Sequence, residues 1–168
     1  EGDSLARCAE KGRLSSLDPD QVARDLCDGV RAMASRDVIH GGLHPGNAIV
    51  QPDGRVKVTD FGITAAVLTG SAPDSTPLEA LAYLAPEQWQ GAEATPRTDI
   101  YSVAAIISLV DRREPIFRIR DRGQIRQEAL STRSHFSPVL AAALHPDPAR
   151  RYTAIDELRC RLGDRNSL

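Results

Sequence analysis

Two side chains that carry oxygen ligands flank a predicted β-hairpin. Asn47 closes the segment HGGLHPGN at residues 40–47, and Asp60 opens the triplet DFG at residues 60–62. Between them, two β-branched runs are separated by QPDG, whose proline and glycine favour a turn. Such a hairpin brings Asn47 and Asp60 close together. The two oxygen-bearing side chains therefore converge at one end of the hairpin.

The same residues also have structural uses that need no metal. An Asn side chain can tie down its own loop, and an Asp side chain can cap neighbouring backbone amides. His40 is expected to be a packed, hydrogen-bonded structural residue. The other histidines show no cysteine or carboxylate spacing of the zinc-binding kind, so no zinc site is expected.

A helix that starts at residue 19 is expected to support this segment from the N-terminal side. Asp18 can cap it, Pro19 suits its first position, and Gln21 can complete a capping box. Apolar residues follow at helical spacing and predict one buried face, made of Val22, Leu26, Val30 and Met33.

Three more helices are predicted further along the chain. One starts at Thr98 or Asp99 and continues to residue 110. Small or apolar residues surround it on nearly all sides, so it should be central and buried. The others cover residues 137–144 and a segment that runs from Thr153 to about residue 163.

Residues 63–84 are rich in Ala, Thr, Ser, Pro and Gly and have no sustained period, which predicts a mobile loop. Its hydroxyl side chains are candidate phosphorylation sites, namely Thr69, Ser71, Ser75 and Thr76. The basic segment 112–126 is interrupted by acidic residues, and a solvated face is the expected structure there.

The composition limits the function classes. A chain of 168 residues is the size of one domain, and its net charge of −2 gives no field that would attract nucleic acid or an anionic membrane. Three widely spaced cysteines favour a reducing compartment, and we expect a cytoplasmic protein. No run of 18 apolar residues and no signal-peptide pattern are present, so no membrane segment is expected in this chain.

Taken together, these motifs resemble the eukaryotic-like, bacterial-type serine/threonine protein kinase family, and specifically its C-terminal lobe. The motifs occur in the family's order: HGGLHPGN at 40–47, DFG at 60–62, APE at 85–87, DIYS at 99–102 and DPARRY at 147–152. The resemblance implies a mainly α-helical lobe with a small β-hairpin, which is part of an α+β fold in a complete kinase. Residues 1–168 would form one partial kinase domain.

The resemblance also implies roles for individual residues. Asn47 and the 60–62 triplet would contact ATP and Mg²⁺, with Asp60 as a metal ligand beside Phe61 and Gly62. The resemblance further implies structural roles: Glu87 should form an ion pair with Arg151, and Asp99 should open the central helix.

Several family residues are replaced at the implied catalytic site. Gly42 stands where the family has its general base, and Gly41 where it usually has Arg. His44 occupies the position of a phosphate-contacting Lys, and Ala80 that of a Thr which steadies the base. We therefore expect a catalytically impaired, pseudokinase-like signalling domain that acts as a regulatory or binding module.

Two other functions stay open. The first is a partial serine/threonine kinase whose N-terminal lobe is encoded upstream, because the chain resembles a kinase that begins at the hinge. The second is a small-molecule kinase, because HGGLHPGN also resembles the loop HGDLHPGN of aminoglycoside and choline phosphotransferases. The expected partners of a pseudokinase lobe are proteins: a kinase N-terminal lobe, an active kinase, or a phosphopeptide-binding domain.

Overall fold

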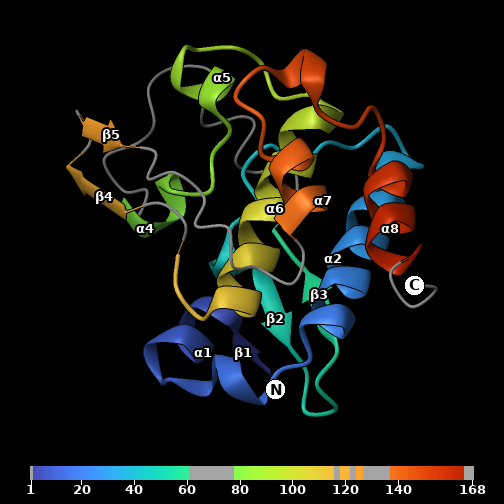
Figure 1. The fold of residues 1–168 in the computed structure, drawn as a ribbon. Coiled ribbons are helices and arrows are strands. Elements are labelled where there is room, and N and C mark those ends of the chain that lie inside the picture. The colour runs from blue at the N-terminus through green and yellow to red at the C-terminus, as the bar shows by residue number, and fades with distance from the viewer. Residues whose placement is uncertain (1, 61–77, 116–117, 122–123, 127–136, 165–168) are drawn as a thin grey trace.

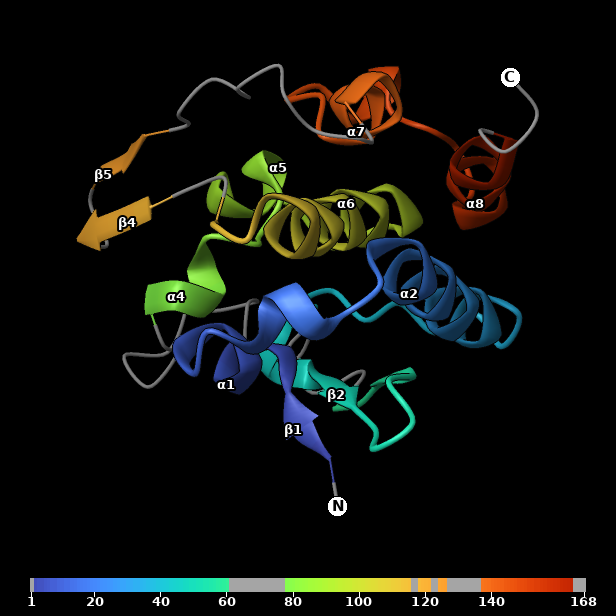
Figure 2. The same ribbon diagram turned by 60° about the horizontal axis from the view of Figure 1, so that its bottom comes forward.

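The computed structural model describes residues 2–60, 78–115, 118–121, 124–126 and 137–164. A long helix, α6 (Pro96–Arg112), runs through the middle of the molecule (Figures 1 and 2). Helix α2 (Pro19–Ala34) packs on one side of α6 and α7 (Ser137–Ala143) on another, while α8 (Ile155–Gly163) packs against α2. The kinase-like, mainly helical architecture agrees with the expectation from sequence.

Helix α6 is the core of this arrangement. Every residue from Thr98 to Val110 is buried, as the apolar surroundings of the predicted helix indicated. The helix begins earlier than predicted, at Pro96, because Thr95 occupies the N-cap position. The Thr98 hydroxyl accepts a hydrogen bond from the Thr95 N–H at 2.9 Å, and Asp99 lies in the first turn instead of at the start.

Helix α2 begins where the sequence predicts. The Asp18 side chain caps it by accepting from the Asp20 N–H at 3.0 Å, and Pro19 is its first residue. The predicted capping box is wrong: the Gln21 amide donates to Asp25 at 2.9 Å, one turn further along the helix. The predicted apolar face is buried in full, and it comprises Val22, Leu26, Val30 and Met33.

The predicted hairpin is present as β2 (Ala48–Val50) and β3 (Val56–Val58), which pair antiparallel with Ala48 opposite Val58. A third strand, β1 (Asp3–Ser4), pairs with the other edge of β2, giving the order β1-β2-β3. A two-residue strand is too short to show a period of two, so no sequence pattern indicated β1.

One buried carboxylate joins the sheet to helix α2. Asp25 accepts from the Val56 N–H at 2.8 Å and from the Arg55 guanidinium at 2.8–3.0 Å. Burial by itself raises the pKa of Asp25, but the hydrogen bonds from Arg55, Val56 and Gln21 outweigh it and lower the pKa below its usual value. The β3 edge is thereby held along α2.

The remaining elements are short. They are α1 (Leu5–Glu10), α4 (Leu78–Leu81), α5 (Pro86–Trp89) and the hairpin of β4 (Arg118–Asp121) with β5 (Gln124–Arg126). Single 3₁₀ turns cover Arg13–Ser16, Pro45–Asn47 and Pro148–Arg150. The β4–β5 hairpin lies at the side of the molecule opposite α8 (Figure 1).

Two further predicted boundaries are corrected. The loop expected over 63–84 gives way to α4 and a turn at 78–84, because residues 80–84 are apolar and buried against the core. Helix α8 begins at Ile155, and Thr153 instead bonds the Glu157 side chain through its N–H and hydroxyl. The basic segment, for which a solvated face was expected, contains the strands β4 and β5.

Several residues singled out from the sequence lie outside the described residues. They are Phe61, Gly62, Thr69, Ser71, Ser75 and Thr76.

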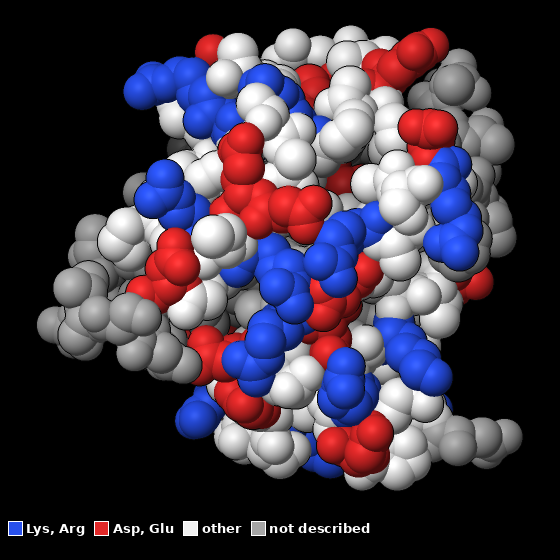
Figure 3. Space-filling model, turned by 90° about the vertical axis from the view of Figure 1, so that its right-hand side faces the viewer, with Lys and Arg blue, Asp and Glu red and all other residues white. Residues whose placement is uncertain are grey.

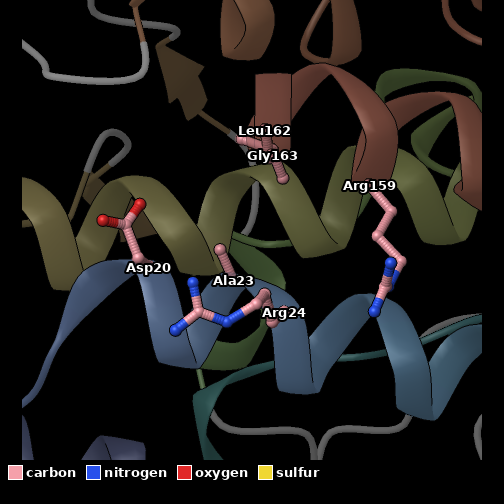
Figure 4. Close-up of a pocket in the computed structure, with 6 residues that line it drawn as sticks. All are labelled: Asp20, Ala23, Arg24, Arg159, Leu162 and Gly163. Atoms are coloured by element: carbon pink, nitrogen blue, oxygen red, sulfur yellow. The ribbon is translucent and has the colours of Figure 1, made fainter. Parts of the chain in front are cut away.

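Lys and Arg side chains intermingle with Asp and Glu on the face formed by α2 and α8 (Figure 3). Arg159 on α8, for example, binds Asp28 on α2 at 2.7 Å. The seam between these helices encloses a cavity of about 20 Å³, lined by Ala23 and Leu162 among others (Figure 4). This volume has room for a single water molecule and for no larger ligand. No helix within the described ranges is long and apolar enough to cross a membrane.

Candidate active site

The loop 40–47 is held in place by a carboxylate from the central helix. Asp99 accepts hydrogen bonds from the backbone N–H groups of His40 and Gly41, both at 2.9 Å. Asp99 is buried, and its burial raises the pKa of the carboxyl, while the two N–H donors counteract the rise. Helix α6 therefore fixes the entry to the loop through backbone contacts that do not depend on the loop's side chains.

His40 is fully buried, and its ring lies within 3.1 Å of the Thr59 carbonyl oxygen through Nε2. A carbonyl can only accept, so the Nε2 atom carries the proton. The Nδ1 atom has no hydrogen-bond partner in the described part of the chain. This geometry ties the loop to the end of the hairpin and fits the structural role expected of His40.

Gly41 and Gly42 lie at the positions for which the resemblance implied an arginine and a general base. Gly41 has a φ of 72°, in the left-handed region that favours glycine. Gly42 is buried and has no side chain to accept a proton from a substrate hydroxyl. The backbone of the loop is thus well defined, and position 42 offers no group that could accept a proton.

His44 serves the loop's own turn. Its Nδ1 atom accepts a hydrogen bond from the Gly46 N–H at 3.1 Å, at the start of the 3₁₀ turn Pro45–Asn47. Burial, with a smaller contribution from nearby His40, lowers the pKa of His44 to about 4, and Asp60 opposes the shift only in part. The ring is therefore neutral near pH 7 and supplies no positive charge to a phosphate.

Gly46 is required beside the His44 ring. A Cβ atom at position 46 would lie only 2.6 Å from the His44 Cε1 atom. The glycine of HPGN is thus explained by local packing against the His44 ring.

Asn47 and Asp60 are brought together by the closing bonds of the hairpin. The Thr59 N–H donates to the Asn47 carbonyl at 2.8 Å, and the Thr59 hydroxyl donates to the Asp60 carboxylate at 3.1 Å. Asn47 is buried, whereas Asp60 is exposed and adopts a φ of 57°. The predicted approach of the two residues is therefore present at the level of the backbone.

This donor set fits Mg²⁺ only in part. Mg²⁺ is commonly held by one or two carboxylates together with substrate phosphates, and Asp60 supplies one exposed carboxylate. Within the described residues, no three His, Cys, Asp or Glu side chains cluster to form a metal site of their own. A metal at Asp60 would thus depend on the phosphates of a nucleotide, which would supply the other ligands.

The predicted ion pair of Glu87 and Arg151 is present. The two guanidinium Nη atoms each donate to a Glu87 carboxylate oxygen at 2.7 Å, and the Arg151 side chain is completely buried. Arg151 also donates to three backbone carbonyls and lies over the Tyr101 ring at 4.8 Å from its centroid. The segment after residue 84 is thereby anchored to the late helices.

Sequence reasoning missed Gln88. Its Oε1 atom accepts from the Ala85 N–H at 3.0 Å, and its Nε2 atom donates to the Gly41 carbonyl at 2.6 Å. The signal in the sequence was slight: Gln88 is at the third position of the short helix that follows the buried stretch 80–85, where a glutamine can accept from the N-cap amide. Nearby Ala80 is buried and offers no hydroxyl, as its identity already implied.

Comparison with known proteins agrees with this geometry. The family model described as "Protein kinase domain" matches residues 1–160. The serine/threonine-protein kinase PknA of Corynebacterium glutamicum is 30% identical over 174 residues, covering 94% of this chain and 36% of that protein. A putative cyclin-dependent kinase F-2 of Oryza sativa is 34% identical over 122 residues, covering 70% of this chain and 37% of that protein.

A further relative is the serine/threonine-protein kinase PknA of Mycobacterium tuberculosis, 39% identical over 96 residues that cover 56% of this chain and 22% of that protein. The chain therefore belongs to the protein kinase family, and it is similar to bacterial serine/threonine kinases. It spans little more than a third of the length of the first two relatives.

Glu87→Ala should destabilise the domain strongly. The substitution leaves the buried Arg151 charge without its carboxylate, which typically costs about 3–5 kcal/mol. Urea unfolding of the variant measures the loss. Glu93→Ala removes an exposed carboxylate from the same region and should change the free energy of unfolding by less than about 0.5 kcal/mol. Equal midpoints for the two variants would contradict a stabilising pair.

The neutral ring of His44 makes stability depend on pH. In the unfolded chain the ring has its ordinary pKa of 6.5 and in the folded chain one of about 4, so the unfolded state binds more protons between these values. The contribution of His44 is complete above pH 6.5 and is lost as the pH falls toward 4. By pH 5 the loss should be about 2 kcal/mol.

His44→Asn tests this dependence, because the Asn oxygen can accept from the Gly46 N–H and does not titrate. The variant should lose less stability than the wild type between pH 7 and pH 5, measured by urea unfolding. His145→Asn is the matched control, since His145 Nδ1 accepts from the Asp147 N–H at 3.0 Å in a similar turn. A loss in His44→Asn as large as in the wild type would refute the assignment.

Proposed function

We propose that this chain is a pseudokinase-like domain that acts as a regulatory or binding module. The observation that carries the proposal is the state of the loop 40–47. Its backbone is held by Asp99 and Gln88 as a formed structure, while Gly42 offers no base and His44 is neutral. A loop kept in shape without its chemistry is suited to binding or signalling.

The size of the expected loss in catalytic rate supports this function. A general base contributes about 10²–10⁴ in rate, or roughly 3–5 kcal/mol. Its absence alone would leave a slow enzyme. At His44 the site also lacks a positive charge, and phosphoryl transfer depends chiefly on positioning and charge stabilisation. A longer chain with a complete N-terminal lobe would still have Gly42 and His44 at these two positions.

ATP and Mg²⁺ remain proposed ligands of the same site. Asn47 and Asp60 stand at the positions that hold metal in the family, and Asp60 is exposed. Mg²⁺ bound there would bridge to nucleotide phosphates. The presence of Asn47 and Asp60 supports the second candidate, a weakly active serine/threonine kinase. Turnover should therefore be measured directly.

The proposed partners are proteins. A kinase N-terminal lobe would cover the sheet formed by β1, β2 and β3, on which Ile49 and Val50 are only partly buried. An active kinase could phosphorylate Thr69, Ser71, Ser75 or Thr76. Each phosphate would add nearly two negative charges for an arginine-lined phosphopeptide-binding domain.

Incubation with radiolabelled ATP, Mg²⁺ and generic protein substrates tests the function. The 168-residue chain, and the same chain fused behind the N-terminal lobe of an active relative, should both transfer no phosphate above background. Turnover that Asp60→Ala abolishes would overturn the proposal and establish the active-kinase alternative.

Gly42→Asp in the unfused chain supplies a second arm of this experiment. The substitution should not restore transfer, because these 168 residues contain no glycine-rich loop and no lysine that would position the nucleotide phosphates. Transfer by this single variant would show that those missing parts are not needed.

A further inference from the structure

The peptide unit that joins Gly41 to Gly42 is held from outside its own loop. Its carbonyl oxygen accepts from Gln88 Nε2 at 2.6 Å, across 47 residues of sequence. The N–H on the other side of Gly41 is held by Asp99. A residue with a φ of 72° and no side chain thus has both of its backbone polar groups fixed by two different elements.

The orientation of the Gln88 amide is determined by chemistry. The Ala85 N–H can only donate, so it must face the amide oxygen, and the Gly41 carbonyl can only accept, so it must face the amide nitrogen. If the two ends of the amide were exchanged, its nitrogen would face the Ala85 N–H, a donor against a donor. Its oxygen would face the Gly41 carbonyl, an acceptor against an acceptor. Glutamine is therefore required here, and neither Glu nor a hydrocarbon side chain reproduces both bonds.

Helix α5, which carries Gln88, is itself held in place by a buried arginine. Gln88 belongs to α5, whose neighbouring residue Glu87 is held by the buried Arg151. Through Arg151, α5 is joined to the backbone carbonyls of His145 and Arg97. Hydrogen bonds of Arg151 thus join the start of α6 and residue 145 to Glu87, and its chain neighbour Gln88 continues the connection to the peptide unit before Gly42.

We propose that Gln88 is a positioning residue that couples the α5 segment to the catalytic loop by fixing the Gly41–Gly42 peptide. Displacement of α5, by a partner or by a change in the segment that precedes it, releases the Gly41 carbonyl and lets the loop change conformation. The coupling concerns the shape of the loop and does not depend on whether phosphate is transferred.

Gln88→Glu tests the coupling with a side chain of nearly the same shape. One carboxylate oxygen still accepts from the Ala85 N–H, while the other faces the Gly41 carbonyl and repels it. Amide hydrogen exchange of Gly42 and Leu43, followed by NMR, should accelerate about tenfold or more, which corresponds to the loss of one buried hydrogen bond. The Gly41 carbonyl ¹³C shift should change at the same time.

Gln90→Glu is the matched control, because Gln90 is exposed at the end of the same helix and the substitution introduces the same charge. It should leave the exchange of Gly42 unchanged. Exchange of Ile106, in the core of α6, reports global opening and should respond little in either variant. Equal acceleration at Gly42 and Ile106 would show that Gln88 contributes only to overall stability, and this would overturn the proposal.

A double-mutant cycle distinguishes coupling from a local contact. Glu87→Gln weakens the anchor of α5 and should accelerate Gly42 exchange in the wild-type background. In the Gln88→Glu background the connection is already broken, so the same change should have little further effect on Gly42. Additive effects of the two substitutions would contradict transmission through Gln88.

Discussion

The hydrogen bonds from His40 and Gly41 to the Asp99 carboxylate are the contacts on which the rest of the site depends. Asp99 lies in the first turn of α6, where the helix dipole favours a negative charge. Its position is fixed because nearly every residue of α6 is buried in the core. A buried carboxylate without these two donors would be costly, so the helix and the loop stabilise each other.

The retained contacts and the lost side chains belong to different parts of the site. Contacts of the loop backbone with Asp99, Gln88 and the Thr59 N–H preserve the shape of residues 40–47. At the positions where the resemblance to kinases implies a general base and a phosphate-contacting lysine, this chain has Gly42 and His44, and the His44 ring accepts a hydrogen bond from the loop's own backbone. Membership of the protein kinase family explains the shape, and these substitutions support a module whose function is binding.

The sequence predicted the elements with strong local signals. The cap at Asp18, the turn between β2 and β3 and the apolar surroundings of α6 each depend on neighbouring residues, and all three are present. The ion pair of Glu87 with Arg151 was predicted only from resemblance to the family. The sequence could not predict the bond from Gln88 to Gly41, because a partner 47 residues away is chosen by the tertiary fold, nor β1, which exists only through its pairing with β2.

Hydrogen exchange of the His40 and Gly41 amides tests most directly whether α6 holds the loop. The two amides should exchange nearly as slowly as core amides of α6 in the wild-type chain, because both donate to a buried carboxylate. In Asp99→Asn the amide that replaces the carboxylate has one acceptor for two donors, and at least one of the two loop amides should lose its protection while the chain remains folded. Rapid exchange of both amides in the wild type would show that Asp99 does not hold the loop in shape.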